Sequence, residues 1–227
     1  MKFMNSNMIP TLMKKWFFIL ILAIFSAFGS QAQQLALLQY GGGGDWYANQ
    51  RTSLPNLIAF AREQGMVLEP TQAVVRPGSP DIFRYPYIHA TGHGRIHFTD
   101  DEAANLRRYL ESGGFLHIDD NYGMDRYARE AIRQLFPDKE LQELPVDFEM
   151  FHEPFDFPNG LPKIHEHDGK RPQAFGIFLD GRLVLLYTYE TDLGDGWESY
   201  EVHHDPPEKH LEALRMGYNI LYYVFTH

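Results

Sequence analysis

The alternation of short apolar runs with amphipathic helical segments constrains the fold of this chain more than any other feature of its sequence. Four apolar runs have the length of buried strands and span residues 35–40, 66–75, 87–90 and 115–118. Helical periodicity follows three of them, starting near Ser53, after Thr99 and near Met124. Strands that alternate with helices predict a mostly parallel, doubly wound sheet with helices on both faces, so we expect a three-layer α/β fold of the flavodoxin-like type.

The second half of the chain adds a hairpin and a last helix to this pattern. Asp180-Gly181 separates two strand-like runs, residues 174–179 and 182–189, and this dipeptide favours a two-residue hairpin turn. Closely spaced prolines in residues 141–172 exclude long elements there, so we expect an irregular cover over one end of the sheet. A C-terminal helix is expected after Asp205.

Residues 1–32 have the features of a secretory signal peptide. Lysines precede an uncharged apolar run from Trp16 to Phe28, and Ser30-Gln-Ala32 has the small-x-small pattern of a cleavage site. A transmembrane anchor is the alternative, but the run is shorter than the roughly 20 apolar residues that span a bilayer. We therefore expect a periplasmic or secreted protein, without membrane insertion after signal removal, whose single α/β domain covers residues 33–227.

Charge and cysteine content limit the chemistry. The chain has 20 Lys and Arg against 30 Asp and Glu, a formal net charge of −10, which falls to −13 when the three lysines of the signal peptide are removed. Nucleic acid is therefore excluded as a partner, because phosphate binding needs a basic face. The chain has no cysteine, which excludes disulfides and every thiol mechanism.

A run of four glycines between the first strand and the first helix marks a candidate site. Glycine loses more backbone freedom on folding than any other residue, so the run suggests that something approaches the backbone closely. No Lys-Ser/Thr follows it and the G-x-G-x-x-G pattern is absent, so nucleotide binding is not expected. A carboxylate beside an aromatic ring suits a sugar or a cation. We expect one wall of a ligand site from Gly42, Gly43, Gly44, Asp45 and Trp46; a tight turn with a packed tryptophan is the alternative.

Polar residues follow the next two strands. Gly92 and His93 come after residues 87–90, and an exposed histidine suits acid–base work or metal ligation, although a loop histidine without function is the alternative. Asp119 and Asp120 come after residues 115–118, and repulsion between neighbouring carboxylates raises the pKa of one of them. Because alternate strand side chains point in opposite directions, one aspartate should face the site while the other caps the next helix.

A later polar segment supplies further candidates: Asp192, Asp195, Trp197 and Glu198. The Asp-x-x-Asp spacing suits oxygen ligands of Ca²⁺ or Mg²⁺, but the longer calcium-loop pattern is missing, and a solvated turn is the alternative. The identity of any metal, and of any other cofactor, stays open.

The remaining histidines are weaker candidates. His165, His167, His203 and His204 lie in polar loops where the spacing fixes no third ligand, so a zinc site is not predicted. His89 and His117 alternate with apolar strand residues and are expected to be hydrogen-bonded groups of the core.

Five motifs in the same order resemble an exported bacterial family known as domain of unknown function 4159. They are Tyr40-Gly-Gly-Gly-Gly-Asp-Trp-Tyr47, Thr91-Gly-His-Gly94, Gly113-Gly-Phe-Leu116 with Asp119-Asp120, Leu193-Gly-Asp-Gly-Trp-Glu198 and Met216-Gly-Tyr-Asn219. The resemblance implies a class I glutamine amidotransferase-like fold, shared with trehalose-utilisation-like proteins, and suggests a cell-envelope protein partner. Amidotransferase activity does not carry over, because the nucleophile turn holds Ile118-Asp119-Asp120 and no cysteine.

Two hypotheses follow. The first is a cysteine-less hydrolase-like domain acting on a polar, carbohydrate-like ligand, with Asp119 or Asp120 as base or nucleophile and His93 as proton donor. Asp45, Trp46, Gly92 and Glu198 complete its pocket. The second is a non-catalytic ligand-binding or assembly domain of the cell envelope. A catalytic site requires His93 to approach Asp119 or Asp120 within about 3 Å or through one water.

Overall fold

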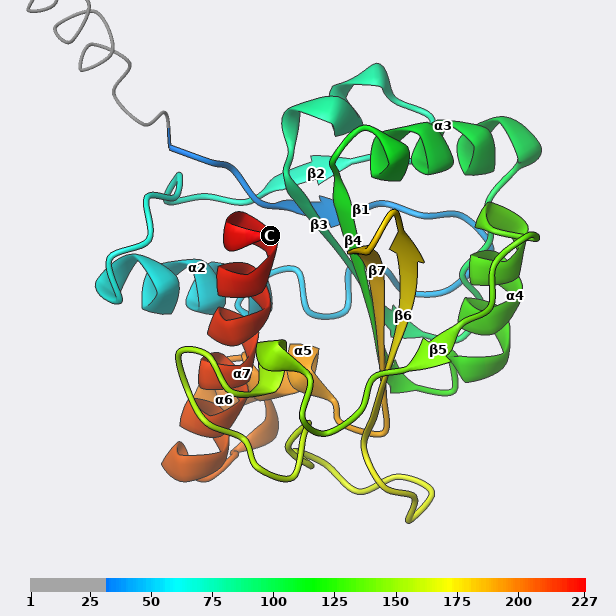
Figure 1. The fold of residues 1–227 in the computed structure, drawn as a ribbon. Helices are drawn as coiled ribbons and strands as arrows, with labels where there is room; N and C mark the ends of the chain where they lie inside the picture. The colour runs from blue at the N-terminus through cyan, green and yellow to red at the C-terminus, as the bar shows by residue number, and fades with distance from the viewer. Residues whose placement is uncertain (1–31) are drawn as a thin grey trace, which may run out of the picture. The chain divides into compact units, whose positions relative to one another are not determined.

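Seven strands form a single sheet in the computed structural model, which describes residues 32–227 (Figure 1). Their order across the sheet is β2-β1-β3-β4-β7-β6-β5. The strands are β1 (Ala36–Leu38), β2 (Ala73–Val75), β3 (Tyr87–His93), β4 (Phe115–Tyr122), β5 (Gln142–Glu143), β6 (Gln173–Leu179) and β7 (Arg182–Tyr189).

Five of these strands are parallel, as the alternation of strands and helices predicts. β1 pairs with β2 and β3, and β4 pairs with β3 and β7, all in parallel register, whereas β6 runs antiparallel between β7 and β5. The positive φ angles of Asp180 (49°) and Gly181 (85°) confirm the predicted two-residue turn between β6 and β7. The fold is therefore α/β with a mostly parallel sheet, compatible with the Rossmann- or flavodoxin-like class.

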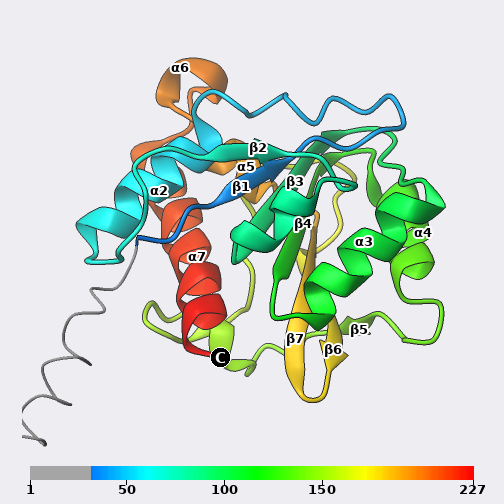
Figure 2. The same ribbon diagram turned by 90° about the horizontal axis from the view of Figure 1, so that it is seen from above.

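Helices lie on both sides of the sheet (Figures 1 and 2). One side carries α3 (Asp100–Glu111) and α4 (Asp125–Leu135), and the other carries α2 (Ser53–Glu63) and α7 (Pro207–Thr226). The predicted capping box at the start of α3 is confirmed: Thr99 and Glu102 each accept a hydrogen bond from the other's backbone N–H. Short elements complete the described chain: η1 (Pro80–Arg84), η2 (Glu149–Phe151), α5 (Leu193–Gly196) and α6 (Tyr200–His203).

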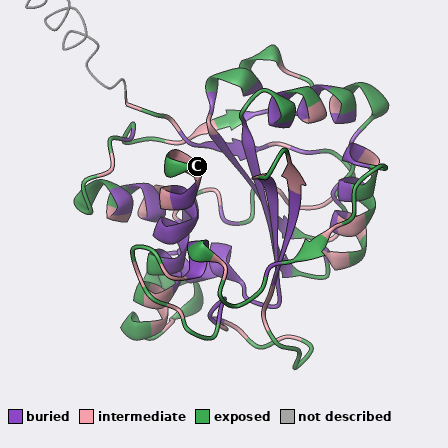
Figure 3. Ribbon diagram, in the orientation of Figure 1, coloured by how far each residue is buried: buried purple, intermediate pink, exposed green. Residues whose placement is uncertain are grey.

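Side-chain alternation along the strands divides the core into two clusters. Ile88 and Ala90 of β3 belong to the cluster that also contains the apolar residues of α3 and α4. Tyr87 of β3 belongs to the cluster that contains those of α2 and α7. The central strands β1, β3, β4 and β7 are buried on both sides (Figure 3), which explains their nearly continuous apolar character, whereas the edge strand β5 is exposed.

The residues from Gln33 to His227 form one compact unit. The predicted signal peptide, residues 1–32, lies outside the described residues apart from Ala32. Within residues 32–227, no helix combines the length and apolar character needed to cross a bilayer.

β3 and β4 are longer than predicted, whereas β1 and β2 are shorter, and β1 covers only Ala36–Leu38 of the predicted run 35–40. The β3–β4 ladder continues through Thr91–Asp119 and Gly92–Asp120, so these polar residues lie in the strands rather than in the loops after them. In the predicted strand 66–75, only Ala73–Val75 are in β2, because Pro70 cannot donate a ladder hydrogen bond.

Candidate functional site

The four-glycine loop pairs with the segment that follows β3. The backbone N–H of Gly44 donates to the Arg95 carbonyl at 3.0 Å, and that of His97 donates to the Gly41 carbonyl at 3.0 Å. A Cβ on Gly42 or Gly44 would lie 2.8 Å from the Arg95 carbonyl oxygen, closer than real Cβ atoms come. The close approach that the glycine run predicts is therefore made by the chain's own backbone, at the Arg95 carbonyl. Gly43, by contrast, has open space around its Cβ position.

Asp45 and His93 form a hydrogen-bonded pair at the carboxyl end of β3. Oδ2 of Asp45 lies 3.1 Å from Nδ1 of His93, and Oδ1 accepts a hydrogen bond from the His93 backbone N–H at 2.5 Å. Gly92 is packed against this pair, because a Cβ there would lie 2.9 Å from Asp45 Oδ1. Trp46 is partly buried against the core, and its ring contacts Tyr47 edge-on with centroids 5.7 Å apart.

Asp119 is fully buried in β4 and faces α5. Its carboxylate accepts hydrogen bonds from the Thr188 hydroxyl and, at 2.6 Å, from the backbone N–H of Gly194. Both oxygens therefore have protein partners. Asp119 joins β4 to β7 and to the start of α5.

Asp120 points to the opposite face of the sheet, as strand alternation predicts. Its Oδ1 accepts a hydrogen bond from the backbone N–H of Met124 at 2.9 Å, just before α4, and its Oδ2 lies 3.4 Å from the Tyr187 hydroxyl. Within residues 32–227, no hydrogen bond joins His93 to Asp119 or Asp120. The direct form of the predicted contact between His93 and one of these acids is therefore absent from the described residues.

Burial raises the pKa of both aspartates. The pKa of Asp119 rises to about 7, although its hydrogen bonds from Thr188 and Gly194 oppose the shift. The pKa of Asp120 rises to about 6, opposed by its hydrogen bond from Met124. Desolvation is the main cause of both pKa increases, and it outweighs the repulsion between the two carboxylates that the sequence predicts.

A pocket of about 290 Å³, called here the Asp120 pocket, opens beside Asp120 at the carboxyl ends of β4 and β7. Tyr122, His167, Lys170 and Glu190 line it together with the start of α4. Tyr122 is 51% exposed, and its ring stacks on His167 with centroids 4.8 Å apart. The pocket thus combines an aromatic face with charged groups of both signs.

A second group of polar side chains, the His–carboxylate cluster, gathers beside α5. It consists of His165, Asp192, Asp195, Glu198, His203 and Asp205. Nδ1 of His165 lies 2.6 Å from Asp192 Oδ2, and its Nε2 lies 2.9 Å from Asp205 Oδ1. Nε2 of His203 lies 2.9 Å from Glu198 Oε2 and 3.5 Å from Asp195 Oδ2.

Two asparagines hold the central carboxylate of this cluster. Oδ1 of Asp195 accepts hydrogen bonds from the side-chain amides of Asn49 and Asn121, the latter at 2.6 Å. Oδ1 of Asn121 in turn accepts a hydrogen bond from the Thr91 hydroxyl at 2.6 Å. The second oxygen of Asp195, Oδ2, faces His165 and His203.

The carboxylates of the cluster are withdrawn from solvent. Asp192 has no exposed surface, Asp195 and Glu198 are each 7% exposed, and the segment is a buried helical turn rather than a solvated one. Oδ1 of Asp192 is buried without a hydrogen-bond partner. Across residues 32–227, no lysine or arginine forms an ion pair with these three acids. The hydrogen bond that Nδ1–H of His165 donates to Asp192 raises the pKa of His165 to about 9.

Trp197 does not face a ligand, contrary to the sequence prediction. Its side chain has no exposed surface, and its Nε1–H donates to the Ala213 carbonyl at 2.8 Å. The ring lies beside His89 and His117, with centroids 5.1 and 6.1 Å away. His117 is hydrogen-bonded, as expected of a core histidine, but both ring nitrogens of His89 lack partners.

The sequence does not predict that His165 and His203 lie close together. His165 lies in a proline-rich irregular segment, His203 lies in α6, and the side chains that support Asp195 come from Asn49 and Asn121. The His165-x-His167 spacing was the one available signal, but no ligand at a fixed distance completed it.

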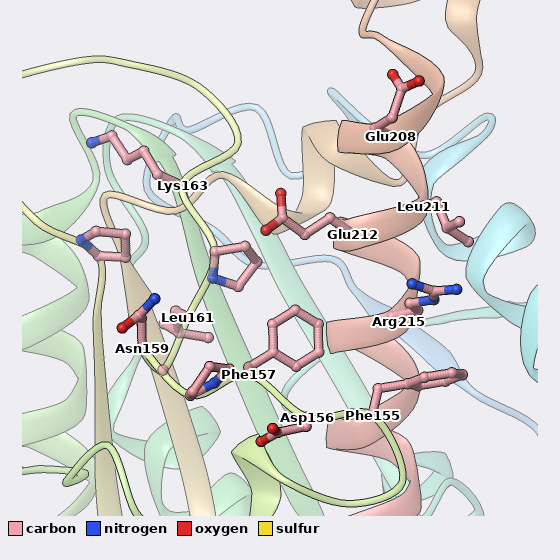
Figure 4. Close-up of a pocket in the computed structure, with 14 residues that line it drawn as sticks. Phe155, Asp156, Phe157, Asn159, Leu161, Lys163, Glu208, Leu211, Glu212 and Arg215 are labelled. Carbon is pink, nitrogen blue, oxygen red and sulfur yellow. The ribbon is translucent and has the colours of Figure 1, made fainter.

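A larger groove, with a volume of about 820 Å³, lies elsewhere, between residues 155–163 and α7. Figure 4 shows Glu208, Glu212 and Arg215 of α7 on one side of this groove, with Asn159, Leu161 and Lys163 of the loop on the other. None of the acids or histidines at the strand ends lines it, so its size alone gives it no chemical role.

Comparison with known families identifies the chain. The profile described as "Domain of unknown function (DUF4159)" matches residues 34–225, and the chain belongs to this family. No curated protein matches the sequence.

Proposed function

We propose that this protein binds a small polar, carbohydrate-like ligand in the Asp120 pocket. The observation that carries the proposal is the exposed ring of Tyr122 beside the buried carboxylate of Asp120 in a pocket of about 290 Å³. A volume near the lower end of the usual range for ligand sites suits a small molecule. Sugar rings present an apolar C–H face to an aromatic ring and hydroxyls to carboxylates and amines. Tyr122, Asp120 and Lys170 offer those partners.

Binding is favoured over the mechanism in which His93 donates a proton. His93 is hydrogen-bonded to Asp45, whereas Asp120 is held by Met124 on the far side of β4 from Asp119. The pocket therefore lacks the acid–histidine pair on which that mechanism rests.

The binding proposal is tested by a thermal-shift screen of monosaccharides, amino sugars and sugar acids. Binding to the folded state alone raises the melting temperature, by an amount that grows with ligand concentration. We expect at least one probe to stabilise the protein and Tyr122→Ala to abolish the shift. Tyr47→Ala is the matched control, because Tyr47 is 59% exposed but does not line the pocket. A screen without a stabilising sugar, or full binding by Tyr122→Ala, refutes the proposal.

Hydrolysis is the second candidate, and the pKa of about 6 at Asp120 favours it. A general base is most effective when its pKa lies near the working pH, and Asp120 would act on a water beside the bound substrate. The test follows release of nitrophenol from aryl glycosides by the wild type and by Asp120→Asn. Loss of turnover with retained sugar binding supports hydrolysis, whereas turnover equal to the wild type rules it out.

The location and fold subclass belong to the same proposal. The basic and apolar features of residues 1–32 support export to the periplasm or beyond, and a role with a cell-envelope partner is consistent with it. The strand order β2-β1-β3-β4-β7 and the helices on both faces support a three-layer, class I glutamine amidotransferase-like subclass. Detection of the protein in the periplasmic or culture fraction tests the location.

A further inference from the structure

We propose that the His–carboxylate cluster is a binding site for a divalent transition-metal ion of the zinc type, with His165, Asp195 and His203 as ligands. This site is distinct from the Asp120 pocket, and the inference does not rest on the proposed ligand binding.

The ligand atoms are already close to the spacing that a metal requires. One nitrogen or oxygen from each of His165, Asp195 and His203 lies within 4.8 Å of those of the other two. Oδ2 of Asp195 is 3.5 Å from Nε2 of His203 and 3.9 Å from Nδ1 of His165. Zn–N and Zn–O bonds of roughly 2.0–2.2 Å in a tetrahedron place ligand atoms about 3.4 Å apart. Small side-chain shifts are therefore sufficient to close the site around an ion.

The surrounding hydrogen bonds orient the ligands as in known metal centres. His165 presents Nδ1 to the cluster while its Nε2 contacts Asp205, the arrangement in which a carboxylate holds the second nitrogen of a metal-bound histidine. Asn49 and Asn121 occupy Oδ1 of Asp195, which leaves Oδ2 for the ion. The ligands are thus positioned independently of one another.

Asp192 gives a separate indication that a cation belongs here. Its side chain is fully buried, yet Oδ1 has no hydrogen-bond partner and Oδ2 contacts both His165 and His167. Leaving a buried carboxylate oxygen unpaired is costly. A metal ion bound to His165 would lie beside this carboxylate and would compensate its charge and that of the adjacent acids, for which residues 32–227 supply no lysine or arginine partner.

The nature of the donors selects the metal class. Two imidazoles with carboxylates suit zinc and its neighbours in the first transition row, whereas Ca²⁺ and Mg²⁺ prefer oxygen ligands alone. We therefore expect Zn²⁺ and Co²⁺ to bind and Ca²⁺ to bind much more weakly.

The test is titration of chelator-treated protein with Zn²⁺ by calorimetry, and with Co²⁺ by visible absorption. We expect one equivalent of Zn²⁺ and a Co²⁺ spectrum of tetrahedral intensity. His203→Asn should weaken Zn²⁺ binding at least about 10-fold, the lower end of losses from metal-site changes. His204→Asn is the matched control: the neighbouring histidine is exposed, contacts Tyr200, and has a φ of 59°, which asparagine tolerates.

The outcomes separate this inference from the function proposed above. Stoichiometric binding that is lost in His203→Asn and kept in His204→Asn supports the metal site, whether or not any sugar binds. Absence of stoichiometric Zn²⁺ binding, or equal losses in the two variants, overturns it. Far-ultraviolet circular dichroism of both variants verifies that they are folded.

Discussion

Replacement of Asp120 by asparagine should stabilise the folded protein near neutral pH. Burial raises the pKa of Asp120 from 3.8 to about 6, so the folded state holds this proton more tightly than the unfolded state does. Stability therefore falls as the pH rises from about 4 to about 6, because the unfolded state ionises first. At 1.36 kcal/mol per pKa unit, the ionised carboxylate costs the folded state about 3 kcal/mol above that range. Asparagine keeps an oxygen to accept the Met124 N–H and avoids this cost.

The assay is thermal unfolding of the wild type and Asp120→Asn across this pH range. In a domain of this size about 3 kcal/mol corresponds to a rise of roughly 6–12 °C in melting temperature near pH 7.5, shrinking toward zero near pH 4. Asp147→Asn removes the same charge from an exposed position and should change little. A gain that is independent of pH, or a loss of stability near pH 7.5, would refute the reasoning.

Three further substitutions test the packing of the fold. Gly44→Ala should lower the free energy of chemical unfolding by about 1–3 kcal/mol, because its Cβ would lie 2.8 Å from the Arg95 carbonyl oxygen. Gly41→Ala, whose nearest contact would be at 3.5 Å, should lower it much less. Equal losses in the two variants would contradict the close approach at Gly44. Burial lowers the pKa of His89 to about 3, so the wild type loses stability as the pH falls through 6.5, the pKa of histidine in the unfolded state. The gain in free energy of unfolding caused by His89→Leu should therefore be about 2 kcal/mol larger at pH 5 than at pH 7. A gain that is the same at both pH values would show that the titration of His89 is not its cause. Thr99→Ala should lower stability by about 1 kcal/mol through loss of the capping box, and an unchanged melting temperature would show that the cap contributes nothing.

Sequence signals that involve only neighbouring residues predict most of the fold. The Asp180-Gly181 turn, the capping box at Thr99 and the period of the helices each depend on residues close in sequence, and the structure confirms all three. The extension of β3 and β4 through their polar residues could not be predicted locally. It depends on partners such as Thr188 and Gly194, which lie about 70 residues away and allow Asp119 to be buried inside a strand.

The candidate site was predicted less well for the same physical reason. Strand alternation placed Asp119 and Asp120 on opposite faces, and the D-x-x-D segment marked Asp192 and Asp195. The hydrogen bonds that Asp195 accepts from Asn49 and Asn121 arise from tertiary folding, in which residues 146 and 74 positions apart meet. The burial of Trp197 could not be predicted either, because nothing in the neighbouring sequence distinguishes a tryptophan that contacts a ligand from one that fills the core.

The ladder between β4 and β7 joins the parallel strands to the hairpin, and side-chain hydrogen bonds reinforce both of its ends. The register runs from Leu116–Leu185 to Asp119–Thr188. Side-chain hydrogen bonds from Thr188 to Asp119 and from Asn121 to Asp195 reinforce the carboxyl end. At the amino end, the Arg182 guanidinium donates to the Gly114 and Leu110 carbonyls at 3.1 and 2.6 Å. Local opening of this half of the sheet should therefore begin at the edge strand β5, which consists of two exposed residues, and the backbone amides of β5 should exchange with solvent sooner than those of β4 and β7. Such opening would leave the polar groups at the carboxyl ends of β4 and β7 assembled.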